Sequence, residues 1–382
     1  MNPKRISLCA ALVLLISISA GAQGVKVGPW LSDCTENAVT ILWTSEVPGM
    51  GYVELEDGTQ LYDTFAGRRI FRTLHSVKVQ GLERGEVLRY RIGGENLKDD
   101  SNARNPKFEG GYISPWYATR MPDPKAASCR FSLFNDIHMK TDKYAALAAQ
   151  VDSAATDFIF LNGDIVSAGN YVLDTLVKYA VEPLGNITHS HPIYFARGNH
   201  EGRGNNPTLI ADVFPHTDPA PFYYTFRQGP VAFIVFDGGE TSEKRSVLYS
   251  GTEVYEEYLN QQIEWAKKAM KDPLFRKAPV KVCLVHIPMI DHPDKTDYII
   301  QRWLNHHIVP MLDKAGVDFM IGADLHEFIM CDPGVMGAPS FPILVNDDVH
   351  RLDFSYEKGG HIHVTTFNAS GEKEFERDFL VK

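Results

Sequence analysis

The sequence predicts an α/β domain preceded by a small all-β sandwich, and three observations support this. The chain has 382 residues, more than one compact core usually holds. Residues 26–120 contain short segments with partial apolar alternation, separated by glycine, asparagine and charged residues, which is typical of a β-sandwich of about one hundred residues. From residue 129 onward, continuous apolar segments alternate with helical ones, as in a parallel sheet covered on both faces.

Composition and charge restrict the partners. Hydrophobic residues make up 44% and charged residues 23%, which is usual for a globular protein. The formal net charge is −10 at pH 7. Because a surface of this sign does not neutralise phosphate backbones, we expect no nucleic-acid-binding surface. Nothing in the sequence defines the oligomeric state.

The first residues have the pattern of a secretory signal peptide. Lys4 and Arg5 precede the apolar run "ISLCAALVLLISI", and Ala20-Gly21-Ala22 forms a small-x-small cleavage site. The run is short for a transmembrane helix, and no other run is long enough. We therefore expect residues 1–22 to be removed and the mature protein to be secreted or periplasmic, with no membrane span.

Four cysteines remain after this cleavage, which are Cys34, Cys129, Cys283 and Cys331. An exported chain permits disulfides, and four cysteines allow three connectivities, so the pairing stays open. The cysteines are scattered without a CxxC spacing, so we expect no thiolate metal site.

A linker separates the two parts of the chain. The expected strands of the first part include "NAVTILWTS", "GYVELED", "LHSVKVQGL" and "VLRYRIGG". The stretch "SPWYATRMPDPKAAS", with its prolines and small residues, follows them and has no periodic pattern.

Apolar segments of the second part end in polar side chains that can bind a metal. These segments are "CRFSLFND", "DFIFLNGD", "PIYFARGNHE", "VKVCLVHIP" and "VDFMIGADLH". Open α/β sheets build their sites at the carboxyl ends of the strands. One such residue could be explained by turn formation, but the repetition on successive segments could not. The candidate site residues are Asp136, His138, Asp164, Asn199, His200, His286, Asp324 and His326.

The motifs "DIH", "NGDI", "GNHE", "VHIP" and "ADLH" together resemble the pattern of the calcineurin-like metallophosphoesterase superfamily. The earlier stretch "VGPWLSDCTENAVTILWTSEVPGMGYVEL" resembles the fibronectin-like domain that precedes the catalytic domain of purple acid phosphatases. The resemblance covers the mature chain. It implies a fibronectin-like sandwich over residues 23–121, and over residues 128–382 a calcineurin-like domain, a β-sandwich flanked by helices. It also implies a phosphoesterase, a hydrolase similar to acid phosphatases.

The resemblance implies two metal ions that together clamp a phosphoryl group and activate a hydroxide. The first would take Asp136, His138, Asp164 and His326, and the second Asp164, Asn199 and His286, with Asp324 where the family has a further histidine. His200 would be catalytic, protonating the leaving oxygen or stabilising developing charge. Glu201 would orient His200 by a hydrogen bond.

Two stretches compete for the last motif, G-H-x-H in the family. "GGHIHV" matches it literally with His361 and His363, whereas "ADLH" carries Asp324 and His326. We favour "ADLH" because it follows an apolar strand, and because its distance from His286 along the chain fits the family better. "HIHVTTF" has the alternation of an ordinary late antiparallel strand.

The aspartate in this motif leaves three alternatives. Asp324 could shift the second site toward harder ions, weaken it until it fills only with phosphate bound, or point away and cripple the enzyme. Iron, manganese and zinc are the expected metals. Purple acid phosphatases carry a tyrosine ligand where this chain has Ser167, so we predict a colourless protein.

Two functions follow. The first is an exported, metal-dependent hydrolase of phosphate monoesters or diesters, with a small phosphorylated substrate. The second is a non-catalytic protein that binds phosphate or a phosphorylated ligand through a weakened second metal site. The presence of both Asn199 and His200 favours the hydrolase, because a site kept only for binding does not need them.

Overall fold

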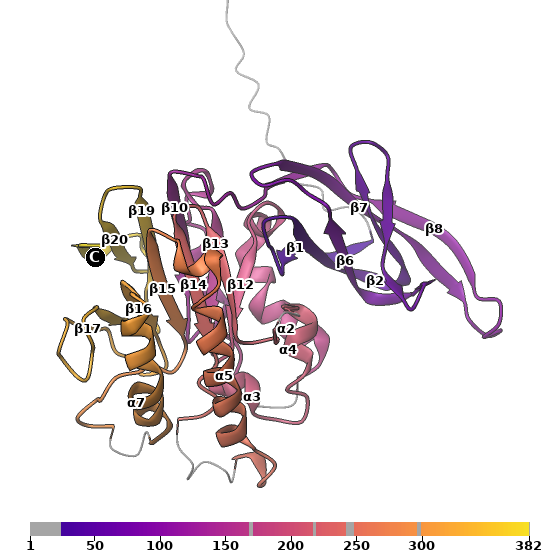
Figure 1. The fold of residues 1–382 in the computed structure, drawn as a ribbon. Helices are drawn as coiled ribbons and strands as arrows, with labels where there is room; N and C mark the ends of the chain where they lie inside the picture. The colour runs from indigo at the N-terminus through magenta and orange to yellow at the C-terminus, as the bar shows by residue number, and fades with distance from the viewer. Residues whose placement is uncertain (1–23, 168–170, 217–218, 242–247, 296–298, 382) are drawn as a thin grey trace, which may run out of the picture.

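The computed structural model describes residues 24–167, 171–216, 219–241, 248–295 and 299–381. The signal peptide expected at residues 1–22 lies outside this range and stays a prediction. The described chain forms a strand-rich N-terminal part and a larger part of sheets and helices (Figure 1). None of the described helices has the length and apolar character needed to cross a bilayer.

The N-terminal part is a β-sandwich built around one long strand. Its strands are β1 (Val25–Ser32), β2 (Ala38–Leu55), β3 (Gln60–Tyr62), β4 (Thr64–Phe65), β5 (Arg68–Arg69), β6 (Arg72–Gln80), β7 (Val87–Asp99), β8 (Lys107–Ile113) and β9 (Tyr117–Arg120). The first half of β2 pairs with β1 and with most of β6, and its second half pairs with β3 and β7. Because β2 serves both layers, hydrogen bonding runs without a break through a seven-stranded sheet.

The second part consists of two six-stranded sheets. Its strands are β10 (Ser128–Phe134), β11 (Phe158–Asn162), β12 (Ile193–Ala196), β13 (Tyr224–Gln228), β14 (Val231–Phe236), β15 (Val280–Val285), β16 (Phe319–Gly322), β17 (Ile329–Cys331), β18 (Ile343–Val345), β19 (Arg351–Glu357), β20 (Ile362–Phe367) and β21 (Lys373–Phe379). The orders are β12-β11-β10-β19-β20-β21 and β13-β14-β15-β16-β18-β17. The strands β10 to β12 run parallel, as do β14, β15, β16 and β18, and the other neighbours are antiparallel.

Helices cover the outer faces of these two sheets. The described helices of this part are α1 (Thr141–Ala148), η1 (Ser153–Ala155), α2 (Leu173–Ala180), η2 (Glu182–His189), α3 (Asn199–Gly202), α4 (Leu209–Val213), α5 (Tyr255–Ala269), α6 (Pro273–Arg276) and α7 (Ile299–Lys314). Apolar residues of α5 and α7 pack on the second sheet, and those of α1, α2 and α4 on the first (Figure 1). Between the sheets, Phe131 stacks on Phe158 and Phe354 and meets the edge of Phe233. The layers are therefore helices, sheet, sheet, helices.

This arrangement agrees with the expected calcineurin-like sandwich and corrects the simpler expectation of one parallel sheet. The parallel strands are divided between two sheets, and each sheet carries antiparallel strands as well. Residues between two stacked sheets are as buried as residues under a helix, so continuous apolar segments suit both arrangements. As expected, "HIHVTTF" lies in an antiparallel strand, β20.

The two parts share an apolar cluster. Trp30 of β1 is fully buried, and its Nε1 donates to the carbonyl oxygen of Val213 at 2.8 Å. Trp30 and Leu42 belong to the same cluster as Phe134 and Tyr144 of the second part. The sandwich thus contributes core residues to its neighbour.

The cysteines Cys34, Cys129, Cys283 and Cys331 are all buried and free. The pairing left open by the sequence is therefore resolved for the described residues, which contain no disulfide.

Candidate metal centre

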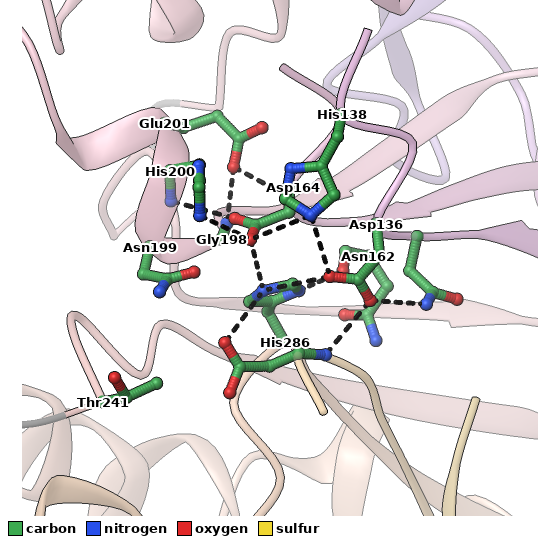
Figure 2. A network of polar contacts seen from close by, with 12 residues as sticks. Asp136, His138, Asn162, Asp164, Gly198, Asn199, His200, Glu201, Thr241 and His286 are labelled. Carbon is green, nitrogen blue, oxygen red and sulfur yellow. Dashed lines mark hydrogen bonds and ion pairs between the residues drawn. The ribbon is translucent and has the colours of Figure 1, made fainter. Parts of the chain in front are cut away.

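The predicted site residues come together at the carboxyl ends of strands from both sheets (Figure 2). Asp136, Asp164 and Asn199 follow β10, β11 and β12 of the first sheet, whereas His286 and Asp324 follow β15 and β16 of the second. The edges of the two sheets are joined at this point, because Asn162 Nδ2 of β11 donates to the carbonyl oxygen of Val285 on β15 at 3.2 Å.

One group of ligand atoms surrounds Asp136. Its Oδ1 lies 3.5 Å from His326 Nε2 and 3.7 Å from His138 Nε2, and the two imidazole nitrogens are 3.2 Å apart. His138 Nε2 is also 3.8 Å from Asp164 Oδ2. Ligands about 2.1 Å from one ion lie about 3 to 3.5 Å from one another, so this group is close to the size of a coordination shell.

A second group surrounds His286. Its Nε2 lies 3.4 Å from Asp164 Oδ2 and 3.7 Å from Asp324 Oδ1. Asp164 Oδ2 thus faces both groups, as a bridging carboxylate must. Asp324 points toward His286 and not away from the site, which removes one of the three alternatives for this residue.

Buried polar atoms without partners mark where ions fit. Among the described residues, Asp136 Oδ1, Asn199 Oδ1, His286 Nε2 and Asp324 Oδ2 are buried and make no hydrogen bond. Buried polar atoms are rarely left in this state, because each costs about 1–3 kcal/mol. A cation in each group would satisfy them, so the residues present fit metal ions.

Neighbouring groups orient these free atoms. His286 Nδ1 donates to the carbonyl oxygen of Asn162 at 2.7 Å, so Nε2 is directed at the site. Asn135 Nδ2 donates to Asp136 Oδ2 at 2.7 Å, which leaves Asp136 Oδ1 as the free oxygen. Asn199 Nδ2 donates to Glu240 Oε1 at 3.2 Å, which leaves the Asn199 amide oxygen free. Each contact thereby directs a second atom of the same side chain toward the two groups.

The crowding of buried acidic groups also favours cations. Burial, with smaller contributions from the carboxylates of Asp164 and Asp136, raises the pKa of Asp324 to about 8 although His286 opposes the shift. Burial alone would also raise the pKa of Asp164, but His286 and His200 lower it to about 2. These carboxylates crowd one small volume, so an added positive charge stabilises all of them.

The backbone at these residues is unusual. Asp136, His138, Asp164, Asp324 and His326 have positive φ angles between 47° and 69°. Side chains other than glycine seldom adopt this left-handed region, although Asn, Asp and His do so more often than other residues. The turn after each strand thereby points its side chain back over the strand end.

Glu201 has a different role from the one expected. Its carboxylate accepts hydrogen bonds from the backbone N–H groups of Asp164, Ile165, Val166 and Gly198, at 2.8 to 3.2 Å. Both oxygens are therefore used to hold the loop after β11 against the start of α3. Glu201 positions the backbone that carries Asp164 and His200 and does not act through the imidazole.

Arg203 and Glu240 are site residues that the sequence analysis missed. Arg203 Nε and Nη2 bond to the Glu240 carboxylate at 2.7 to 2.9 Å, and Arg203 Nη1 lies 2.9 Å from His200 Nε2. Tyr249 also donates to Glu240, at 3.0 Å. Burial lowers the pKa of His200 to about 4 although Asp164 opposes this, and the Arg203 charge adds to the lowering. The sequence analysis missed Arg203 and Glu240 because they lie far apart in the chain and no local sequence pattern indicates that they pair.

The competing histidine stretch lies elsewhere. His363 on β20 bonds to Asp378 at 2.7 Å and lies 3.4 Å from Glu376, both on the neighbouring strand β21. None of these residues belongs to the two groups described above. The structure therefore places "ADLH", and not "GGHIHV", at the site.

The fold and this set of carboxylates, amide and imidazoles define a metal-dependent phosphoesterase. The family profile described as calcineurin-like phosphoesterase matches residues 129–328, and the chain belongs to this family. A search of proteins of curated function found no match.

Comparison with solved structures found similarities at low sequence identity, and the first of the two below shows a shared fold. Purple acid phosphatase PPD1 from seeds of yellow lupin (Lupinus luteus) is 15% identical with a TM-score of 0.68, over 93% of this chain and 74% of that one. GAP50, described as the anchor in the inner membrane complex of Plasmodium, is 12% identical with a TM-score of 0.49, over 67% of this chain and 90% of that one. These similarities concern the fold alone.

Proposed function

We propose that the protein hydrolyses phosphate monoesters or diesters with two metal ions held by the strand-end residues. The first ion is assigned to Asp136, His138, Asp164 and His326, and the second to Asp164, Asn199, His286 and Asp324. The observation that carries this proposal is that buried atoms without hydrogen bonds converge in the two groups of ligand atoms between the sheets. When bound, such ions supply a hydroxide nucleophile and neutralise charge on the phosphoryl oxygens.

The chain's own residues would do the remaining work. Asn135, Asn162 and Glu240 fix the direction of the ligand atoms, so little reorganisation is needed during the reaction. His200 Nε2 lies 3.7 Å from Asp164 Oδ2, at the edge of the site. We assign to this edge the leaving oxygen of the ester, where positive charge or a proton is required.

Asp324 decides the character of the second site. A carboxylate adds an oxygen ligand and a negative charge where the family has a histidine, which favours harder ions such as manganese or iron over zinc. Because Asp324 Oδ1 faces His286, we assign it a ligand role. Replacement by histidine should therefore change which metals bind.

The test combines elemental analysis with hydrolysis of 4-nitrophenyl phosphate and bis(4-nitrophenyl) phosphate. The wild-type chain and Asp324→His are compared, with Asp136→Asn as the variant that weakens the first site. We expect two metals per wild-type chain, turnover that a chelator abolishes, and a shift toward zinc in Asp324→His. The ratio of the two rates distinguishes monoesterase from diesterase.

The contrary result is also defined. A wild-type chain that holds one metal or none and turns over neither ester, while Asp324→His gains activity, would contradict the hydrolase. The natural protein would then be a phosphate-binding protein with this fold.

We also propose that the protein is exported after removal of residues 1–22. The N-terminal pattern of basic residues, apolar run and small residues supports this. Expression of the full chain in a host with a secretory pathway, followed by N-terminal sequencing, tests it. A mature protein that begins near residue 23 is expected, and an uncleaved N-terminus in the cytoplasm would contradict it.

A further inference from the structure

The contacts of His200 single out one residue outside the family motifs. Arg203 is buried next to α3 and uses two of its nitrogens, Nε and Nη2, to bind Glu240. Its remaining nitrogen, Nη1, lies 2.9 Å from His200 Nε2. The guanidinium thus connects a buried carboxylate to the imidazole at the edge of the metal centre.

The same carboxylate also reaches a proposed ligand. Glu240 Oε1 accepts a hydrogen bond from Asn199 Nδ2 at 3.2 Å, and Oε2 accepts one from the hydroxyl of Tyr249 at 3.0 Å. A chain of contacts therefore runs from Asn199 through Glu240 and Arg203 to His200. Displacement of the Arg203–Glu240 pair would move both ends of this chain.

The direction of the hydrogen bond follows from the chemistry of arginine. A guanidinium has only donors, so His200 Nε2 accepts from Nη1 and the imidazole is neutral in this arrangement. The permanent positive charge at this edge of the site belongs to Arg203. His200 Nε2 is also the ring nitrogen that lies 3.7 Å from Asp164 Oδ2, so the Arg203 charge sits beside the imidazole on the side that faces the bridging carboxylate.

We propose that Arg203, paired with Glu240, is a positioning residue that fixes the imidazole of His200 and supplies a positive charge beside its site-facing nitrogen. This rests on the proposed function, because the charge matters where the leaving oxygen becomes negative. Preorganised positive charge at such a point stabilises the transition state more than the ground state. The benefit is larger for a poor leaving group, which carries more negative charge as its bond to phosphorus breaks.

The chain contains a matched control. Arg197 and Asp237 form a second buried bidentate pair, with Nε to Oδ2 at 2.7 Å and Nη2 to Oδ1 at 3.0 Å. The Asp237 carboxylate also accepts from Tyr258 and the backbone N–H of Gly239, and its backbone bonds to Gln262, so none of these contacts reaches a proposed ligand or His200. Disruption of this pair costs stability without touching the His200 contact.

The experiment compares phenyl phosphate, a poor leaving group, with 4-nitrophenyl phosphate, a good one. The double variant Arg203→Gln with Glu240→Gln removes both charges, so no buried charge is left unpaired. Arg203→Lys keeps the positive charge but cannot form the bidentate hydrogen bonds of the guanidinium. In the double variant we expect kcat to fall about 100-fold for phenyl phosphate and about tenfold or less for 4-nitrophenyl phosphate, since one preorganised donor is typically worth such factors. Arg203→Lys should recover part of the difference between the substrates.

The control variant, Arg197→Gln with Asp237→Asn, should lower both rates equally if it lowers them at all. An equal loss for both substrates in the Arg203 variants would overturn the proposal. So would a control variant with the same dependence on the leaving group.

A second readout needs no turnover. In protein labelled with 15N-histidine, the Nε2 signal of His200, assigned through His200→Gln, should shift in the Arg203 variants and stay in place in the control. An unchanged signal would overturn the proposal. If the metal-loaded wild type hydrolyses neither ester, the proposed function fails, and the His200 signal alone then decides whether Arg203 positions the imidazole.

Discussion

At the scale of single residues, Glu201 shows how one carboxylate can hold an entire site. Its Oε1 accepts from Ile165 and Val166, and its Oε2 from Asp164 and Gly198. In Glu201→Gln one oxygen becomes an NH₂ group, which faces two backbone donors whichever way the amide lies. We expect the free energy of unfolding to fall by about 2 kcal/mol or more, as for other buried hydrogen-bonded charges.

A urea unfolding curve measures this loss, and metal content should fall with it. Glu257→Gln, a change at an exposed position of α5, is the matched control and should alter the unfolding midpoint little. A Glu201→Gln variant as stable as the control would contradict the role given to Glu201.

His75 in the sandwich makes stability depend on pH. It is fully buried, stacks on Trp43 with ring centroids 4.8 Å apart, and has Nε2 at 3.0 Å from Ser45 Oγ. Burial lowers the pKa of His75 to about 4. Below pH 6.5 His75 becomes protonated in the unfolded chain but stays neutral in the folded chain. The free energy of unfolding therefore falls by about 3 kcal/mol as the pH falls to 4.

Urea unfolding of wild type and His75→Gln between pH 7 and 4 tests this. Other groups titrate in both proteins, so the difference between the two curves is the quantity to measure. The wild type should lose stability more steeply than His75→Gln as the pH falls. Parallel curves would show that His75 does not titrate as described.

The sequence predicted the ligand residues of the site better than the residues that hold them in position by hydrogen bonds. Asp136, Asp164 and His286 were identifiable because each directly follows an apolar strand, which is a local pattern. Arg203 and Glu240 were missed because their pairing depends on how two loops pack in three dimensions. For Glu201 the position was evident, but its partners are backbone groups that no side-chain pattern reveals.

At the scale of elements, the turn after β11 leaves no space for a larger residue at Gly163. Gly163 has φ +79°, and a Cβ atom there would lie 2.5 Å from His286 Nδ1. Gly67 has nearly the same φ, +80°, but no atom within 4 Å of its Cβ position. The two glycines therefore separate backbone strain from a steric clash.

Gly163→Ala and Gly67→Ala should each lose about 1 kcal/mol for the left-handed backbone. Only Gly163→Ala should also displace His286 and lower metal content, measured by elemental analysis. Full metal content in Gly163→Ala would contradict this, because it would mean that the backbone of the turn shifts to accommodate the alanine without displacing His286.

The division of strands between sheets lay beyond the sequence for a similar reason. Segments such as β11 and β15 are apolar throughout, and this pattern does not say which strands are hydrogen-bonded neighbours and which are stacked. The expectation of two stacked sheets came from the resemblance to a family. The periodicity of the sequence predicted only the order of strands and helices along the chain.

At the scale of the whole molecule, the shared apolar cluster predicts that both parts unfold together. Trp30 lies on the sandwich but is fully buried among residues of the second part, where it also donates to Val213. Trp30→Ala should cost about 3–5 kcal/mol. Calorimetry should show one transition for wild type and an early, separate transition of one part in this variant.

Trp116, which is 39% exposed, provides the control, and Trp116→Ala should keep a single transition near that of wild type. Two transitions in the wild type would mean that the sandwich and the second part are energetically independent despite their contact.

The left-handed backbone at Asp324 has a consequence for how such a site can diverge. Its φ of 69° belongs to the region that both aspartate and histidine adopt more readily than most residues. An exchange between these two residues therefore leaves the turn intact and alters only the donor atom offered to the ion. One substitution between these two residues therefore changes the metal preference of the site without requiring a compensating change in the fold.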